Sequence, residues 1–167
     1  MRYYDIFCLK ICDQTYQTSE YQYDVMGNPI AVIGYDGTGQ NVVRYEYDKG
    51  SRLTKMITGL SSYEMTADGA VTQYEYDILG RKIKETDPIG QTVSYEYDRN
   101  GNIVRYTDRN GTVTETSYHD FGSPKQITAK NGAVTQEKGY QYDGFGRMVY
   151  AQFVQNGIVT DSKAIHV

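Results

Sequence analysis

The sequence has no tryptophan, three prolines and two cysteines among its 167 residues, and it has few leucines. Isoleucine and valine supply most of the aliphatic side chains, and β-branched residues favour a pleated strand over a helix. Leu, Ile, Val and Phe together make up about a fifth of the chain, a level at which strongly charged sequences tend to be disordered. The net charge is only −4. The chain therefore needs another source of buried surface.

Three further features are absent from the sequence: a basic stripe, a long apolar run and a pair of cysteines close enough to form a disulfide. Lysine and arginine are scattered singly, so there is no basic stripe for nucleic acid. No apolar run reaches the length of a membrane span, and the opening MRYYDIFCLKICDQ carries charges where a signal peptide would be apolar. Cys8 and Cys12 are four residues apart, about 13 Å in a strand, which is too far for a disulfide.

Tyrosine is abundant, with 18 residues. Each ring can bury a large apolar area while its hydroxyl keeps a hydrogen-bond partner, so tyrosine can replace the scarce aliphatic residues. Many tyrosines lie in one tetrapeptide: YEYD begins at Tyr45, Tyr74 and Tyr95, and YQYD begins at Tyr21 and Tyr140. A catalytic site needs one converging set of residues. A motif repeated along a single chain therefore indicates architecture.

A glycine follows the motif at a nearly fixed distance, as in DVMG, DILG, DRNG and DGFG. Asp at the first position of a type I turn bonds the turn backbone, and Gly at the fourth adopts the left-handed conformation that leads into the next strand. The aspartates three residues before a glycine include Asp24, Asp77, Asp87, Asp98, Asp108 and Asp143. Glycine spacings of ten and eleven residues alternate and give a unit of 21 residues with two strands and two turns. The sequence predicts an all-β chain of consecutive antiparallel hairpins.

Direct pairing on both sides of each turn would place the first tyrosine of the motif opposite a β-branched residue. The predicted pairs are Tyr21 with Ile30, Tyr74 with Ile83, Tyr95 with Val104 and Tyr140 with Val149. Such pairs contribute about 0.2–1 kcal/mol each. The two tyrosines of a motif share one face of the strand, and the residue between them points to the other face. A one-residue bulge after the glycine would change this register.

Two repeats depart from the pattern. Ser51 stands where the motif has glycine, and Thr116 and His119 replace the first tyrosine and the aspartate of the hairpin that contains Gly122. We expect these hairpins to be the looser ones.

The sequence predicts no catalytic, metal or cofactor site. His119 and Asp120 are adjacent, but no nucleophile motif accompanies them, and a degenerate turn is the simpler interpretation. The stretch DRNGN from Asp98 is similar to the first half of an EF-hand loop but lacks the later ligands and the closing glutamate, which favours a plain turn over a calcium site. No zinc pattern is formed by the available soft ligands, Cys8, Cys12, His119 and His166.

The pattern YxYDxxGR, followed about ten residues later by a DPxG or NG turn, resembles the RHS, or YD, repeat. The resemblance covers nearly the whole chain as a single array over residues 1–167. The array has about seven repeats, which begin near Tyr4, Tyr21, Tyr45, Tyr74, Tyr95, Thr116 and Tyr140. The resemblance implies a curved, ribbon-like sheet or partial shell, as in Tc toxin subunits, bacterial polymorphic toxins and teneurins. The self-cleaving aspartate site and the toxin domain of those proteins have no recognisable counterpart, so we expect no toxin or catalytic domain.

The residues to which we assign a structural role in the repeats are the tyrosines, aspartates and glycines of the motifs. They are Tyr21, Tyr23, Asp24, Gly27, Tyr45, Tyr47, Asp48, Tyr74, Tyr76, Asp77, Gly80, Tyr95, Tyr97, Asp98, Gly101, Tyr118, Gly122, Tyr140, Tyr142, Asp143 and Gly146.

Two hypotheses of function follow. The first is a non-enzymatic structural module of a secreted or toxin-associated β-shell, located outside the cell or at its surface. Its partners would be neighbouring repeats, copies of the same chain joined through terminal edge strands, and a toxin polypeptide. The alternative is a module that binds a glycan or a protein through an exposed tyrosine face. Tyrosines buried between strands favour the first hypothesis, and a contiguous exposed aromatic patch favours the second.

Overall fold

The computed structural model describes residues 18–35, 39–63 and 69–165, which form thirteen β-strands and no helix. The all-β prediction is therefore confirmed. The chain divides into two compact units, Met1–Gln91 and Thr92–Val167, and each is considered by itself. The predicted first repeat at Tyr4, both cysteines and His166 lie outside the described residues.

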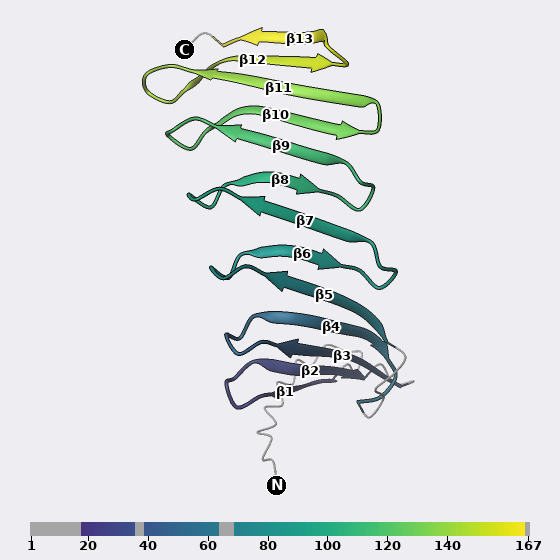
Figure 1. The fold of residues 1–167 in the computed structure, drawn as a ribbon. Coiled ribbons are helices and arrows are strands. Elements are labelled where there is room, and N and C mark those ends of the chain that lie inside the picture. The colour runs from purple at the N-terminus through teal and green to yellow at the C-terminus, as the bar shows by residue number, and fades with distance from the viewer. Residues whose placement is uncertain (1–17, 36–38, 64–68, 166–167) are drawn as a thin grey trace. The chain divides into compact units, whose positions relative to one another are not determined.

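The N-terminal unit is an antiparallel meander in which each strand pairs with the next one along the chain (Figure 1). Its strands are β1 (Thr18–Tyr23), β2 (Pro29–Tyr35), β3 (Gln40–Tyr47), β4 (Leu53–Leu60), β5 (Ala70–Tyr76) and β6 (Lys82–Thr86). The turns after β1, β3 and β5 all lie at the same end of the strands, because every second turn of a meander returns to that end.

The C-terminal unit repeats the same arrangement. Its strands are β7 (Thr92–Tyr97), β8 (Ile103–Thr107), β9 (Val113–Tyr118), β10 (Pro124–Asn131), β11 (Val134–Tyr142), β12 (Met148–Gln155) and β13 (Ile158–Ala164). In both units the strand that carries the tyrosine motif ends at its second tyrosine, directly before the turn residue Asp or His.

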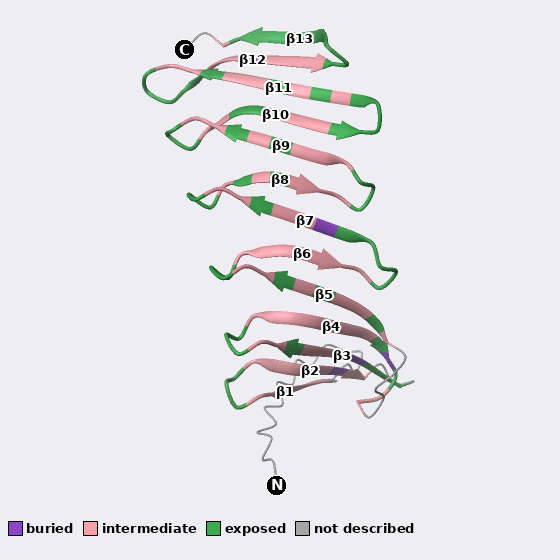
Figure 2. Cartoon of the chain, in the orientation of Figure 1, coloured by how far each residue is buried: buried purple, intermediate pink, exposed green. Residues whose placement is uncertain are grey.

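Each unit is a single layer of strands, so most side chains are half-buried (Figure 2). One compact apolar cluster lies in the N-terminal unit, where Ile33, Val42 and Leu60 are buried. Tyr35, Ile57 and Tyr63 pack against it. No polar or charged residue among those described is buried. No second layer covers the strands among the residues that the structure describes, so these strands bury surface between neighbouring side chains on their own faces, which large rings do well.

The predicted cross-strand pairs are wrong, because each tyrosine lies opposite a residue two positions further along. Tyr21 pairs with Val32 and Tyr74 with Glu85, while Tyr95 pairs with Tyr106 and Tyr140 with Ala151.

Two irregularities cause the shift. The turn itself adds one residue, since the Asp24 N–H donates to the Asn28 carbonyl rather than pairing across at Gly27. A β-bulge adds the second, because Tyr23 pairs with Pro29 and Gln22 with Ala31, which leaves Ile30 without a partner in the ladder. The residues predicted to face the tyrosines, Ile30, Ile83, Val104 and Val149, are the bulge residues.

The described residues include no helix of the length and apolarity needed to cross a membrane.

Candidate functional site

The turns after the tyrosine motif share one hydrogen-bond pattern. In the turn at Asp77, the Gly80 N–H donates to the Asp77 carbonyl at 3.0 Å, and Gly80 has φ of 82°. Oδ1 of Asp77 accepts the N–H groups of Leu79 and Arg81, each at 2.9 Å. The same contacts recur at the turns that begin with Asp24, Asp48, Asp98 and Asp143. The carboxylate therefore holds the turn backbone, as the turn chemistry predicts.

The second carboxylate oxygen binds the side chain of the residue after the fourth turn position, which is glycine in four of these turns and Ser51 in the fifth. Oδ2 of Asp77 accepts from Nε of Arg81 at 2.6 Å, and Oδ2 of Asp98 accepts from Nδ2 of Asn102 at 2.8 Å. The residues in this role are Asn28, Arg52, Arg81, Asn102 and Arg147. No role was predicted for these residues from the sequence, although Asn or Arg recurs after the turn.

These contacts lower the pKa of the turn aspartates below the ordinary value of 3.8. For Asp98 and Asp24 the largest contribution is the hydrogen bond from the asparagine side chain. For Asp48, Asp108 and Asp143 it is the backbone N–H of the residue after the turn. For Asp77 the largest effect, desolvation, raises the pKa, but the hydrogen bonds together outweigh it. Each aspartate therefore binds a proton less readily in the folded chain than in the unfolded one.

A loss of stability at acid pH follows from these shifts. A carboxylate with a lowered folded pKa contributes its full stabilisation above the unfolded value of 3.8, and it loses this contribution as the pH falls through the folded pKa. The melting temperature should therefore fall steeply below about pH 4. The Asp98→Asn variant is the matched control, because asparagine keeps the turn but cannot be protonated. Its melting temperature should lie below that of the wild type at pH 7 and approach it at pH 3. A difference that is the same at both pH values would contradict the prediction.

The second tyrosine of the motif links neighbouring hairpins. The Tyr47 hydroxyl donates to the Pro29 carbonyl at 2.9 Å, and the Tyr76 hydroxyl donates to the Leu53 carbonyl at 2.8 Å. In the C-terminal unit the Tyr118 hydroxyl donates to the Ile103 carbonyl at 2.9 Å. Each acceptor is the residue directly before a bulge. The bulge ends the regular ladder there, and the tyrosine of the next repeat satisfies the carbonyl.

Replacing Tyr76 by phenylalanine tests this contact. The ring remains, but the half-buried Leu53 carbonyl loses its donor, so the free energy of unfolding should fall by about 1 kcal/mol. The control is Tyr106→Phe, since the Tyr106 ring packs on Tyr95 with ring centres 5.3 Å apart and no bond from its hydroxyl is seen within the described residues. Urea unfolding measures both variants. Equal losses in the two would show that the Tyr76 hydroxyl makes no special contribution.

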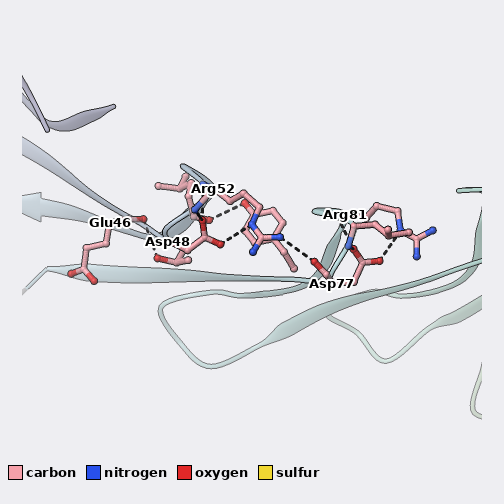
Figure 3. A network of polar contacts seen from close by, with 10 residues as sticks. Glu46, Asp48, Arg52, Asp77 and Arg81 are labelled. Carbon is pink, nitrogen blue, oxygen red and sulfur yellow. Dashed lines mark hydrogen bonds and ion pairs between the residues drawn. The ribbon is translucent and has the colours of Figure 1, made fainter. Parts of the chain in front are cut away.

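Side chains also connect one turn to the next along the row of turns at this end of the strands. Nδ2 of Asn28 donates to Oγ of Ser51 at 3.1 Å. Nη1 of Arg52 donates to the Asp77 carbonyl at 3.0 Å, and its guanidinium lies 5.4 Å from the centre of the Tyr76 ring. Figure 3 shows Arg52 between its own turn, at Asp48, and the following one, at Asp77. The same side chain therefore closes one hairpin and holds the next.

The residue between the two tyrosines points to the opposite, more exposed side. Glu46, Glu75 and Glu96 are exposed, and each lies directly opposite a basic residue on the following strand. The Lys55–Glu46 and Lys84–Glu75 distances are 3.0 and 2.9 Å, and Arg105 lies 3.8 Å from Glu96. Exposed pairs of this kind contribute little to stability, about 0.2–1 kcal/mol each.

The two turns that depart from the sequence motif, at Ser51 and Gly122, keep the backbone geometry of the other turns. Ser51 has φ of 58°, and its N–H donates to the Asp48 carbonyl. The Gly122 N–H donates to the His119 carbonyl at 2.8 Å. In place of a carboxylate, the His119 ring stacks on Phe121 with centres 5.0 Å apart, and the Tyr142 ring meets His119 edge-on at 5.5 Å. Whether these hairpins are looser stays a prediction.

None of the fifteen tyrosines in the described part of the chain is exposed, and all are half-buried. Within the same part, no three His, Cys, Asp or Glu residues are grouped closely enough to hold a metal ion. The structure thus brings the predicted tyrosines, aspartates and glycines into contacts within and between hairpins.

Comparisons with known proteins agree with this geometry. The model of the RHS repeat matches residues 83–113 and 97–134. Residues 83–134 of this chain are therefore similar to the RHS repeat. A search of curated protein sequences gave no match.

Two solved structures share the fold of this chain. A crystal structure of TcdB2-TccC3 superposes with a TM-score of 0.60 at 16% identity, over 91% of this chain and 9% of the other. A crystal structure of TcdB2-TccC3 without the hypervariable C-terminal region gives 0.59 at 16% identity, over 89% and 9%. The chain thus spans 9% of the length of these two chains.

Proposed function

We propose that this chain is a non-enzymatic structural module, a single array of about seven RHS repeats that forms a segment or small relative of a toxin-associated β-shell. The proposal rests on the hydrogen bonds that the recurrent polar groups make within the sheet. The aspartates bond their own turns, and the Tyr47, Tyr76 and Tyr118 hydroxyls bond the neighbouring strand. A motif whose groups are used in this way stabilises a repeat and its junctions.

The exposure of the tyrosines supports this function over a glycan- or protein-binding tyrosine face. A binding face would present a contiguous exposed aromatic patch. The described tyrosines are half-buried instead, and ring pairs such as Tyr95 and Tyr106 pack on each other. Their rings therefore act mainly between strands.

The partners and location of the module are also proposals. The similar crystal structures contain TcdB2 together with TccC3. By analogy, the partners of this chain are a toxin polypeptide and further RHS-repeat segments or copies of the chain, and its location is outside the cell or at the cell surface. Strand β13 offers an edge for strand pairing, since its residues are exposed and Ile158 keeps 70% of its surface accessible.

Hydrogen exchange of the full chain tests whether the repeats support one another. In the Arg52→Ala variant the turn at Asp77 loses a donor from the preceding hairpin, so amide exchange should become faster between β5 and β6 as well as in the hairpin of Arg52 itself. The control is Arg147→Ala, because Arg147 pairs with Asp143 of its own turn. Its effect should remain in the β11–β12 hairpin. Faster exchange confined to the β3–β4 hairpin in Arg52→Ala would contradict an array held together by contacts between neighbours.

A further inference from the structure

Two tyrosines of the C-terminal unit, Tyr95 on β7 and Tyr106 on β8, lie directly opposite each other in the sheet. Tyr95 is the first tyrosine of its motif. In the other motifs the first tyrosine lies opposite a different kind of residue: Val32, Met56, Glu85 or Ala151. The repeat itself therefore does not require a second ring at position 106.

The two rings lie side by side. Their centres are 5.3 Å apart and their planes are tilted by 44°. Directly paired residues have Cβ atoms about 4.5–5.5 Å apart, so the rings keep the spacing of the strands along their length. Glu96 and Arg105, the next pair in the ladder, point to the opposite face. Neither side chain therefore comes between the two rings.

Two adjacent phenol rings can be joined by oxidation. A tyrosine that loses one electron and one proton becomes a phenoxyl radical, whose unpaired electron is shared with the carbons next to the oxygen-bearing carbon. Two such radicals combine by forming a carbon–carbon bond between these positions, and each ring then moves the hydrogen of that carbon to its oxygen. The pair gives up two electrons and two protons in total. Hydrogen peroxide, acting through a peroxidase, accepts them and becomes two molecules of water.

The surroundings of the pair suit this reaction. Both tyrosines are half-buried, so each ring is accessible in part to an oxidant and is held in part by its neighbours. Holding two reacting groups side by side makes their reaction effectively unimolecular, which favours coupling within the pair over coupling between chains. On its other side Tyr106 lies opposite Thr114 of β9, so that strand places no third phenol directly beside it.

We propose that Tyr95 and Tyr106 form a site of oxidative coupling, at which a one-electron oxidant of the peroxidase class joins the two rings into dityrosine. The new bond links β7 to β8 covalently and closes the hairpin, as a disulfide would. The chain has only two cysteines, Cys8 and Cys12, and neither lies on these strands. The site goes beyond the proposed structural function and is independent of it, because the contacts between repeats do not involve the link.

Oxidation of the full chain tests the proposal, with a haem peroxidase and equimolar hydrogen peroxide as the oxidant and with the cysteines alkylated beforehand. The material that keeps the mass of a single chain should show dityrosine fluorescence, and peptide mapping by mass spectrometry should assign the main link to Tyr95 and Tyr106. Tyr106→Phe should lower the yield of this intrachain dityrosine at least about fivefold, because the remaining tyrosines lack a paired ring. Tyr95→Phe should cause the same loss.

Tyr150→Phe is the matched control, since it also removes one tyrosine, and Tyr150 lies opposite Gln141 and Ala164. Its yield should equal that of the wild type. The proposal is overturned if dityrosine forms only between chains, if the main link joins other tyrosines, or if Tyr106→Phe keeps the yield of Tyr150→Phe. Circular dichroism before oxidation shows whether each variant keeps the fold, and the agreement of the two variants of the pair guards against an effect of folding in one of them. The exchange experiment on Arg52 uses the unoxidised chain, so either idea can fail without the other.

Discussion

Replacing Leu60 by alanine should lower the free energy of unfolding of the N-terminal unit by about 2–4 kcal/mol, the usual range for a large buried aliphatic residue. Leu60 retains 2% of its surface exposed and lies directly opposite Val42, which is fully buried. A single-layer sheet has few places where such a side chain is enclosed. The cavity would therefore open in the compact apolar cluster formed by Ile33, Val42 and Leu60.

The control is Ile78→Ala, at a turn position where the side chain is 99% exposed. This change removes a similar aliphatic group from water rather than from a core, so its effect should stay within about 0.5 kcal/mol. Urea unfolding monitored by tyrosine fluorescence measures both variants. Similar losses in the two would show that the cluster around Leu60 does not hold the unit together.

The turns could be predicted from the sequence because their chemistry is local. Asp24 and Gly27, for example, lie within four residues of each other, and both roles follow from the turn type. The glycine at the fourth position has positive φ in every such turn that the structure describes, including Gly27, Gly80, Gly101 and Gly146. The all-β class follows equally from composition and the repeat.

The register could not be predicted in the same way. The bulge at Ile30 depends on which carbonyl is left outside the ladder, and the Pro29 carbonyl is satisfied by Tyr47, 18 residues away. A single motif gives no sign of this contact, since donor and acceptor belong to different repeats. The pairing of Tyr95 with Tyr106 also depends on register, because direct pairing on both sides of the turn would place a different residue opposite Tyr95.

The register of the strands also explains which groups the motif tyrosines contact. With direct pairing, the first tyrosine of each motif would face a β-branched residue, and the hydroxyl of the second tyrosine would have no assigned partner. The observed bulges move those residues out of the ladder and leave a carbonyl that the Tyr76 hydroxyl reaches from the next hairpin. A tyrosine at this position thus combines ring packing with a hydrogen bond, which phenylalanine could not provide.

Replacing Gly101 by valine should lower the free energy of unfolding by about 1–2 kcal/mol through backbone strain. Gly101 has φ of 90°, a region that β-branched residues strongly avoid. An added Cβ would meet no atom within 4 Å, so crowding does not contribute and the loss measures the conformation alone. The N–H of Gly101 also donates to the Asp98 carbonyl at 3.2 Å, which a relaxed φ would weaken.

Gly139→Val is the matched control, because it makes the same change in an equally open place without a left-handed φ. Valine suits a strand better than glycine, so this variant should be as stable as the wild type or slightly more stable. Thermal unfolding of the two variants separates strain from the simple addition of a side chain. If Gly101→Val melted at the temperature of Gly139→Val, the turn would accommodate valine by changing its backbone, and the type I turn with a left-handed fourth residue would not be required for the hairpin.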